Sequence, residues 1–329
     1  MSRKTLLIVA AFSLMMVGIV IDRFEPTGKQ ADERFYPGLE SLLPEVRQVT
    51  LVAAGQETNL VREGGIWQVA EREGYPADFE KLSQLLMGLA KAKLKERKTA
   101  LVSNHESLSV TEAEGTNITL STRSEELSAV LGKTLSKGAG TFARYRSADQ
   151  VWLLDQSLTG SANPADWLDN PLISLPQAEI ESIEVAIKDE KIYRAVKQSE
   201  GDWGLERLPA GRKLRYSTVL TPLATAVSQL SIVDVARYDE ARWDAPRAQV
   251  TYQLSEGKAL LLSAVMANDQ YWLRVVWQPG LSETAPDSDG GSRVSVPMRV
   301  SDFDYRISKR VFDDLSQSLA SLLAEEQEE

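Results

Sequence analysis

The chain has 329 residues, of which 43% are hydrophobic and 26% are charged, and it contains no cysteine. This composition suits a globular protein of about two domains and excludes a disordered class. Without cysteine there can be no disulfides, thiolate metal sites or cysteine nucleophiles. The formal net charge is -10 at pH 7, so we expect the body to be repelled by nucleic acid and by anionic lipid headgroups.

The first predicted element is an apolar helix at the N-terminus. Residues 5–21, TLLIVAAFSLMMVGIVI, carry no charge, and as a helix they would span roughly 26 Å. Arg3 and Lys4 precede this segment, so the positive-inside rule places the N-terminus in the cytoplasm. We predict a single-pass protein of a bacterial inner membrane, with an uncleaved anchor at residues 1–22 and a periplasmic body. A cleavable signal peptide is the alternative, but no A-x-A-like cleavage site follows the apolar segment.

Residues 23–38 are rich in Pro, Gly and charge and are predicted to be a linker. A first α+β repeat is predicted over residues 39–164. Its expected strands are residues 46–53, 57–63, 66–71, 116–122, 141–147 and 150–156. A helix is expected after the third strand, because apolar residues recur there at helical spacing. These residues are Phe79, Leu82, Leu85, Leu86 and Leu89.

A second α+β repeat is predicted over residues 165–329, ending in an acidic tail. Its expected strands are residues 180–188, 191–198, 202–208, 248–255, 259–266 and 271–277. The expected helix carries Leu220, Leu223, Val227 and Leu230 on one face. A closing strand and helix are expected between residue 303 and the tail, and residues 283–293 have the composition of a loop.

The two predicted repeats show the same elements in the same order. Equivalent positions lie at nearly constant offsets, which are 134 residues for Val49 and Ile183, 136 for Trp67 and Trp203, and 138 for Leu85 and Leu223. A shared order of strands, tryptophan strand and helix is difficult to obtain by chance. The sequence therefore predicts an α+β fold of tandem duplicated units, each an antiparallel β-meander with one packed helix.

The block GGIWQVAEREGYPADFEKLSQLLMGLAKAKLKERKT (64–99) lies in the first copy, and ADWLDNPLISLP (165–176) leads into the diverged second copy. Together with the N-terminal apolar segment, these blocks resemble the bacterial family called domain of unknown function 4340. The resemblance covers most of the chain after residue 38. It implies association with ABC-2-type exporter systems of the gliding-motility type, with a permease and another periplasmic subunit as partners. It implies no reaction and no catalytic residue.

Two short motifs suggest chemistry that the rest of the sequence does not support. LGKT (131–134) suggests a phosphate loop, but Ser128 stands where that loop requires glycine, so we predict a β-turn between strands. His105 is the only histidine, and we expect it in a solvated loop because no orienting acid or nucleophile is identifiable. The run KAKLKERK (91–98) is expected to be a solvated helix end.

Carboxylate pairs are the remaining candidates for catalysis or metal binding. DSDGG (287–291) has only part of a calcium loop and is predicted to be an ordinary loop. Asp302 with Asp304, and Asp313 with Asp314, could serve as glycosidase acids. Alternation places Asp302 and Asp304 on the solvated face of an edge strand. We therefore predict no enzymatic activity, no cofactor and no metal.

The sequence leaves three functional interpretations of the whole chain, and the tryptophans bear on them. Trp67 and Trp203 are expected in the two cores, whereas Trp167 and Trp243 lie in connecting segments and are possible partner-binding residues. The favoured function is a non-catalytic, membrane-anchored periplasmic subunit or adaptor of an ABC-type envelope export complex. The alternative is a periplasmic binding module for peptidoglycan or another envelope polysaccharide. A hydrolase is the third possibility.

Overall fold

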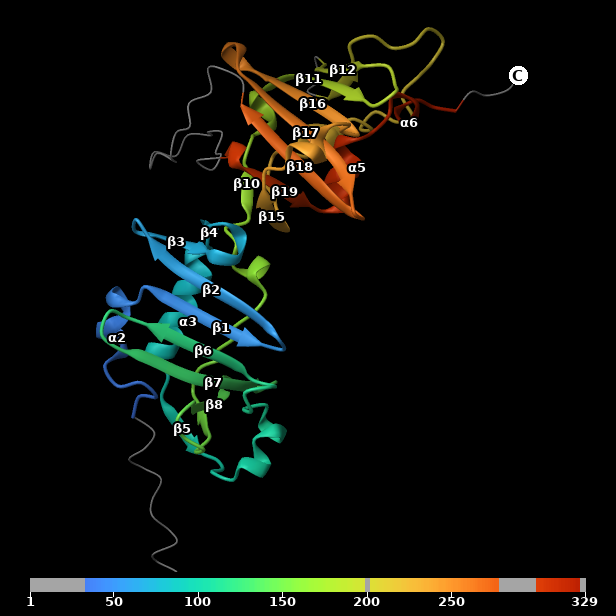
Figure 1. Cartoon of the computed structure of the whole chain (residues 1–329). Helices are drawn as coiled ribbons and strands as arrows, with labels where there is room; N and C mark the ends of the chain where they lie inside the picture. Colours follow the sequence, from blue (N-terminus) through green and yellow to red (C-terminus); the bar gives the residue numbers. More distant parts are fainter. Residues whose placement is uncertain (1–32, 199–201, 278–299, 326–329) are drawn as a thin grey trace, which may run out of the picture. The chain divides into compact units, whose positions relative to one another are not determined.

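The computed structural model describes residues 33–198, 202–277 and 300–325. The predicted anchor at residues 5–21 and the loop at 283–293 lie outside this range. Within the described residues, no helix is long and apolar enough to cross a membrane. The chain is mostly β, with two large antiparallel sheets and short helices (Figure 1). The predicted antiparallel sheets are confirmed, whereas the helical content is smaller than an α+β class implies.

Two compact units make up the described chain. The first comprises residues 33–63 and 79–163, and the second comprises residues 64–78 and 164–325. The helices and 3-10 turns of the first unit are α2 (Leu39–Leu42), η2 (Leu43–Glu45), α3 (Phe79–Lys91), η4 (Val102–Asn104) and η5 (Glu106–Leu108). Its strands are β1 (Gln48–Ala53), β2 (Gln56–Glu63), β5 (Leu94–Arg97), β6 (Thr116–Ser121), β7 (Glu126–Thr134), β8 (Thr141–Tyr145) and β9 (Trp152–Leu154).

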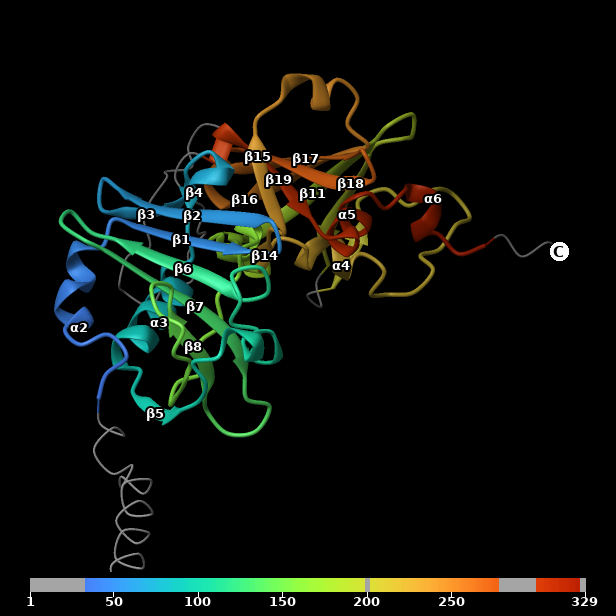
Figure 2. The same ribbon diagram turned by 60° about the horizontal axis from the view of Figure 1, so that its bottom comes forward.

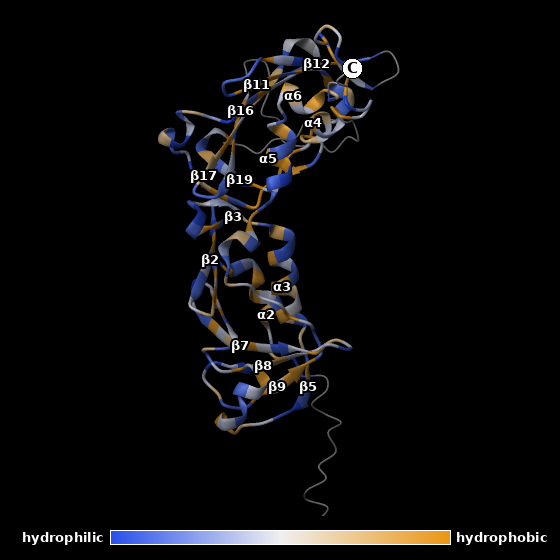
Figure 3. Cartoon of the chain, turned by 90° about the vertical axis from the view of Figure 1, so that its right-hand side faces the viewer, coloured by the Kyte–Doolittle hydropathy of each residue, from blue (hydrophilic) through white to orange (hydrophobic). Residues whose placement is uncertain are grey.

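The strands of the first unit lie in the order β2-β1-β6-β7-β8-β9-β5, and neighbours are antiparallel. Alternation along β1 buries Val49 and Leu51 and directs Thr50 to the opposite face. The helices α2 and α3 lie on the same side of this sheet (Figure 3).

The helix predicted from apolar spacing is confirmed as α3. Its buried residues include Leu82, Leu85, Leu86 and Leu89. Phe79, at the first position, is 61% exposed and contributes little to the core. The basic run after this helix is not a solvated helix end, because α3 ends at Lys91 and Leu94–Arg97 forms β5. Strand pairing of β5 with β9 overrides the helical propensity of the lysines.

The second unit begins with the hairpin of β3 (Ile66–Val69) and β4 (Tyr75–Pro76), joined by η3 (Ala70–Arg72). Its helices and 3-10 turns are η6 (Pro164–Trp167), η7 (Gln177–Glu179), α4 (Thr221–Thr225), η8 (Glu240–Trp243), η9 (Ser255–Gly257), η10 (Val300–Asp302), α5 (Lys309–Leu315) and α6 (Leu319–Leu322). Its further strands are β10 (Pro171–Ile173), β11 (Ile180–Ile187), β12 (Tyr193–Lys197), β13 (Trp203–Leu205), β14 (Leu230–Ser231), β15 (Asp234–Arg237), β16 (Ala248–Leu254), β17 (Ala259–Ala267), β18 (Gln270–Trp277) and β19 (Phe303–Ile307).

The large sheet of the second unit has the strand order β13-β12-β11-β16-β17-β18-β19-β15, and β10 pairs separately with β14. One face is covered by α4 and α5, which lie side by side (Figure 2). The buried hydroxyl of Tyr252 on β16 donates to the Leu223 carbonyl of α4 at 2.8 Å. The Tyr193 hydroxyl on β12 donates to the Gln317 carbonyl after α5 at 2.9 Å. These bonds fix the helical segments on the sheet.

The helix predicted around residues 220–230 is much shorter than expected. It is reduced to α4, five residues long, with Pro222 in its first turn. The Thr225 hydroxyl donates back to the Thr221 carbonyl at 2.9 Å, a bond that competes with regular helix geometry. Turns follow, and Leu230 already belongs to β14, which pairs with β10. Pairing with a distant strand therefore ends the helix before its apolar pattern ends.

The two units repeat one strand topology. The orders β2-β1-β6-β7-β8-β9-β5 and β12-β11-β16-β17-β18-β19-β15 correspond strand by strand. Val49 pairs with residues of β2 and β6, and Ile183 pairs with residues of β12 and β16 in the same way. Both residues are fully buried, as are nearly all of the side chains of Trp67 and Trp203. The two strands β5 and β15, which close this order, were not predicted from the sequence.

Candidate interaction surface

Polar side chains occupy one face of the first sheet, opposite to Val49 and Leu51. The Thr50 hydroxyl donates to Asn59 Oδ1 at 2.8 Å, and Gln48 Nε2 donates to the same oxygen at 2.9 Å. On the neighbouring strands β6 and β7, the Thr119 and Ser128 hydroxyls lie 3.1 Å apart. These five side chains are half-buried. Hydrogen bonds within each of the two groups, one on β1 and β2 and the other on β6 and β7, hold these side chains in fixed orientations.

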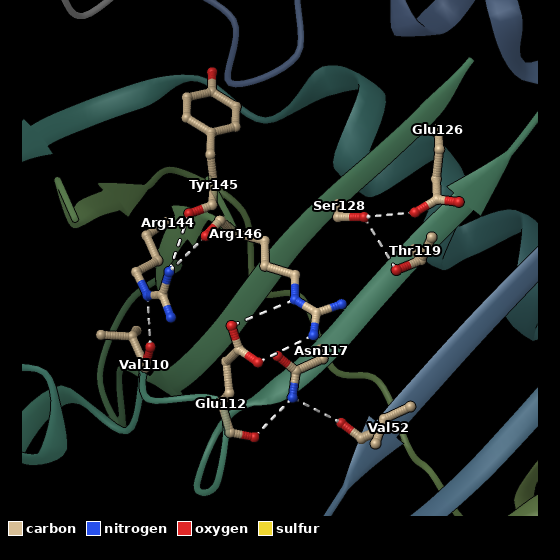
Figure 4. Close-up of polar contacts among 10 residues, drawn as sticks. All are labelled: Val52, Val110, Glu112, Asn117, Thr119, Glu126, Ser128, Arg144, Tyr145 and Arg146. Carbon is tan, nitrogen blue, oxygen red and sulfur yellow. Dashed lines mark hydrogen bonds and ion pairs between the residues drawn. The ribbon is translucent and has the colours of Figure 1, made fainter. Parts of the chain in front are cut away.

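Towards β8 this face is covered by residues 98–115, the segment between β5 and β6. Arg144 is buried beneath it and donates to backbone carbonyls only (Figure 4). Its Nε bonds to the Val110 oxygen at 2.8 Å, and its Nη1 bonds to the Tyr145 and Arg146 oxygens, each at 3.2 Å. A longer bond reaches the Ala148 oxygen at 3.4 Å. The guanidinium thus joins the covering segment to the turn after β8.

Two further contacts fix the covering segment to the sheet (Figure 4). Arg146 Nη2 lies 3.0 Å from Glu112 Oε2, and both side chains are about half exposed. The hydrogen bond and the positive charge of Arg146 lower the pKa of Glu112. The buried Asn117 side chain donates through Nδ2 to the backbone oxygens of Glu112 at 2.8 Å and Val52 at 3.4 Å. These residues therefore serve loop attachment.

An arginine stands at the equivalent position in the second sheet. In the first sheet Arg144 pairs with Val130, and in the second sheet Arg274 pairs with Ser263. Both pairs have the same place in the two strand orders. The guanidinium carbon of Arg274 lies 3.6 Å from the ring centroid of Tyr238, which is 40% exposed. At this distance the arginine stacks on the aromatic ring.

Next to Arg274 lies the fully buried side chain of Asp304. Three donors converge on its carboxylate, which are the Asp239 backbone N–H at 3.0 Å, Trp243 Nε1 at 2.9 Å and Arg242 Nη1. All three come from residues 238–247, the segment between β15 and β16. Burial raises the pKa of Asp304, and the three donors act against that rise.

Asp304 occupies a position that is apolar in the first unit. Leu273 pairs with Tyr305, so Arg274 faces Asp304, and the corresponding neighbour of Arg144 is Val151. Val151 is fully buried in a cluster with Val110 and Val130. The segment between β5 and β6 is thus held by apolar packing and Arg144, whereas the segment between β15 and β16 is held by an ion pair.

A second ionic contact fastens the β3–β4 hairpin within the second unit. Arg72 binds Asp234 of β15 through two bonds, Nε to Oδ1 at 2.5 Å and Nη2 to Oδ2 at 3.1 Å. Arg306 Nη2 of β19 lies 3.6 Å from the same carboxylate. The ring of Tyr75 on β4 meets the Phe303 ring edge to face, with centroids 5.2 Å apart. Charged and aromatic groups again fix one segment on another.

The two proposed partner-binding tryptophans, Trp167 and Trp243, differ in burial. Trp167 is fully buried at the end of η6, and its carbonyl accepts the Asp78 N–H at 2.7 Å. Its side chain therefore does not lie on the surface of the described chain. Trp243 is half-buried and donates to Asp304. The structure thus brings together Trp243 and Asp304, and no local pattern in the sequence links these two residues.

Three expectations about candidate catalytic residues are wrong. His105 is 2% exposed, and its Nε2 lies 2.9 Å from the Asp149 carbonyl. Asp304 is buried within β19, which lies between β18 and β15 and is not an edge strand. LGKT forms the end of β7 and is not a turn. For His105 and Asp304, a neighbouring segment covers a side chain that the local pattern placed in solvent.

The other acidic candidates lie in ordinary surroundings or outside the described residues. Lys309 Nζ lies 2.6 Å from Asp313 Oδ2, and Arg310 Nε lies 3.9 Å from Asp314 Oδ2. Both are pairs one helical turn apart on α5. DSDGG falls in the part of the chain that the structure does not describe. Among the described residues, no group of three His, Cys, Asp or Glu side chains is placed to hold a metal ion.

Sequence reasoning missed the arginines. Arg144 and Arg274 each follow an aromatic residue by two positions, in FAR (142–144) and WLR (272–274). This shared pattern, read together with the repeat, was the available signal. Arg242 had none, because its partner Asp304 is 62 residues away.

A comparison with family models matches residues 67–256 to Domain of unknown function (DUF4340). Neither the curated proteins nor the solved structures yield a match.

Proposed function

Because the chain belongs to the family of domain of unknown function 4340, we propose that it acts without catalysis, as a membrane-anchored subunit of an envelope export complex. Residues 5–21 anchor it in a bacterial inner membrane, and the two β-rich units lie in the periplasm. There they form an adaptor that binds an ABC-2-type permease and an associated periplasmic subunit.

The observation that carries this proposal is the use of the buried and half-buried charges. Asp304 binds Arg242 and Trp243, and Asp234 binds Arg72, so that each carboxylate fastens a segment to a sheet. Such groups serve a scaffold, since three donors bind each carboxylate and hold it in place. The two large sheets share one strand order, and we infer that they arose by tandem duplication.

The apolar segment at residues 5–21 supports the membrane location, because seventeen uncharged residues reach across a bilayer. Polysaccharide binding is the second candidate and requires an exposed aromatic platform. Four tryptophans that could form one are buried: Trp67, Trp167, Trp203 and Trp272. We therefore place export ahead of polysaccharide binding and make the second an outcome of the test.

The test is a pull-down of the full-length chain after cross-linking in its native membrane, with mass spectrometry of the captured proteins. The expected result is co-purification of an ABC-2-type permease together with its ATPase. A matched chain whose residues 5–21 are replaced by a cleavable signal should lose both subunits. That loss would show that the anchor takes part in assembly.

Capture of cell-wall fragments without any transporter subunit would contradict the adaptor proposal and favour polysaccharide binding. Equal capture of the permease by the anchored chain and by the cleaved chain would show that the anchor is not needed for assembly.

A further inference from the structure

Basic side chains gather at one edge of the first sheet, where β5 is the last strand. Residues 33–34 and 91–98 contain six basic and two acidic residues, although the whole chain has a net charge of -10. The basic residues are Arg34, Lys91, Lys93, Lys95, Arg97 and Lys98. Lys91, Lys95, Arg97 and Lys98 are exposed. We call this set the basic edge.

The start of the described chain lies against the basic edge. The Leu94 N–H donates to the Glu33 carbonyl at 2.8 Å, and the Phe35 N–H donates to the Ala92 carbonyl at 2.8 Å. Residues 33–35 and 92–94 are therefore direct neighbours, and they lie at the same end of the first unit (Figure 1). Residue 33, where the described chain begins, therefore lies at this edge.

The distance between this edge and the proposed anchor is limited by chain length. Eleven residues, from 22 to 32, connect residue 21 to residue 33. A fully extended chain of that length spans no more than roughly 40 Å. If residues 5–21 cross the membrane, as the proposed function requires, residue 33 remains within that distance of the lipid headgroups, and the basic edge begins beside it.

Two exposed apolar side chains follow the basic edge in the sequence, after Thr99 and Ala100. Leu101 and Val102 are 64% and 61% exposed, and they lie at the beginning of η4. Exposed aliphatic side chains beside lysine and arginine are typical of surfaces that enter the boundary between headgroups and acyl chains. The Leu101 N–H is bonded to the Thr99 hydroxyl at 3.1 Å, which fixes the start of this segment.

We propose that the basic edge, together with Leu101 and Val102, docks on anionic phospholipid headgroups of the membrane that carries residues 5–21. The inference rests on the proposed anchor for proximity and on charge complementarity for the choice of surface. The remainder of the acidic chain is repelled by the same headgroups. Attraction at one edge and repulsion elsewhere orient the first unit on the bilayer.

The two acidic residues of these segments, Glu33 and Glu96, leave the six basic residues in excess. Glu96 Oε1 lies 2.7 Å from Lys98 Nζ, and the two side chains are 55% and 28% exposed. Because this pair is partly exposed, it is weak and can be exchanged for phosphate. Arg97 Nε donates to the Gln150 amide oxygen at 2.8 Å, which leaves its charge uncompensated by that contact.

The test measures the distance of the basic edge from the bilayer in the full-length protein. The chain has no cysteine, so Ser103→Cys creates one labelling site on η4, beside the apolar pair. The labelled protein is placed in nanodiscs of phosphatidylcholine, or of phosphatidylcholine and phosphatidylglycerol at a ratio of seven to three, with an acceptor dye on a lipid. Energy transfer should rise with phosphatidylglycerol and fall again in 0.5 M salt.

A label at Gln56→Cys provides the positional control, because β2 is at the opposite edge of the first unit's strand order. Its energy transfer should not increase with phosphatidylglycerol. Equal responses of the two labels, or no response of the label at position 103, would overturn the docking proposal.

Charge variants provide the second arm. The test variant combines Lys95→Gln, Arg97→Gln and Lys98→Gln, and the control combines Arg47→Gln, Arg62→Gln and Arg123→Gln, which are also exposed. Each basic residue near an anionic surface contributes about a fivefold factor to docking. The ratio of docked to undocked protein should therefore fall about a hundredfold in the test variant. The control variant should show the same rise of energy transfer with phosphatidylglycerol as the labelled protein without these charge substitutions. Identical behaviour of the two variants would also overturn the proposal.

Failure of the anchor is distinguishable from failure of the docking. Alkaline carbonate extraction of native membranes releases the full-length chain only if residues 5–21 do not hold it. In that case the chain is floated with vesicles of the same two lipid compositions. Salt-sensitive flotation with phosphatidylglycerol alone supports docking without an anchor, and absence of flotation overturns it.

Discussion

At the scale of single residues, Asp304 shows how the two units diverged in chemistry while keeping one topology. Its counterpart in the strand register is Val151, and both side chains are fully buried. An apolar contact in one unit is thus an ionic contact in the other. A buried ion pair of this kind adds little net stability over apolar packing, but loss of one partner is costly.

We expect Asp304→Ala to lower the free energy of unfolding by about 3–5 kcal/mol, since it leaves Arg242 and the Trp243 Nε1–H without their buried acceptor. Urea unfolding of the full chain, followed by tryptophan fluorescence, measures this change. Asp313→Ala is the matched control, because its pair with Lys309 is exposed, and it should change stability by less than about 0.5 kcal/mol. Equal effects would argue against a fastening role for Asp304.

Arg144 and Arg146 offer a second comparison, since they are two residues apart and differ in burial. Arg144→Lys removes the planar donor set that serves four carbonyls, and we expect a cost of about 1–3 kcal/mol. Arg146→Lys alters an exposed pair with Glu112 and should cost less than about 0.5 kcal/mol. Thermal unfolding of the two variants side by side decides the point. A larger effect at Arg146 would contradict the assignment.

At the scale of elements, the position of LGKT at the end of β7 explains the glycine and the lysine that suggested a phosphate loop. Gly132 is required by close packing, because a Cβ there would lie 2.4 Å from the Leu108 oxygen and 2.9 Å from the Ser109 oxygen. Lys133 is exposed, and its Nζ donates to the Ser107 carbonyl at 3.0 Å. The glycine therefore serves the covering segment.

Gly132→Ala should destabilise the protein by about 1–3 kcal/mol, since backbone oxygens cannot move aside as a flexible side chain does. Lys133→Ala should leave the free energy of unfolding within about 0.5 kcal/mol of the wild type. Calorimetric titration with a nucleoside triphosphate completes the test. Nucleotide binding that disappears in Lys133→Ala would restore the phosphate-loop interpretation.

The helices α3 and α4 show the limit of periodicity as a predictor of elements. Both sequences have apolar residues at helical spacing, yet α3 has thirteen residues and α4 has five. The difference comes from β14, whose pairing with β10 requires an extended backbone at Leu230. Local spacing indicates which residues are buried, while distant strand pairing determines where a helix ends.

At the scale of the whole molecule, burial of tyrosine hydroxyls links stability to pH. Desolvation is the main cause that raises the pKa of six of the nine tyrosines. They are Tyr36, Tyr75, Tyr145, Tyr193, Tyr252 and Tyr305. Their neutral forms are favoured in the fold, so the folded state holds these protons more tightly than the unfolded state.

Stability should therefore fall as the pH rises above 10, where an unfolded chain releases tyrosine protons and the fold does not. In an absorbance titration, ionisation of these six tyrosines should coincide with the loss of circular dichroism. Ionisation of all nine before any unfolding would contradict their burial. Tyr252→Phe removes one of these ionisable hydroxyls, so this variant should unfold at a higher pH than the wild type. The comparison subtracts the cost of the hydrogen bond to the Leu223 carbonyl, which the variant also loses.

The sequence by itself determined the apolar N-terminal segment, most strands, the helix α3, the buried pair Trp67 and Trp203, and the repeat. These features depend on local composition and on period, which a linear text contains. Only the tertiary structure decided the shared strand order, the positions of β5 and β15, and the burial of His105, Trp167 and Asp304. The physical reason is that a covering segment or a distant strand, tens of residues away, decides which polar groups lose contact with water.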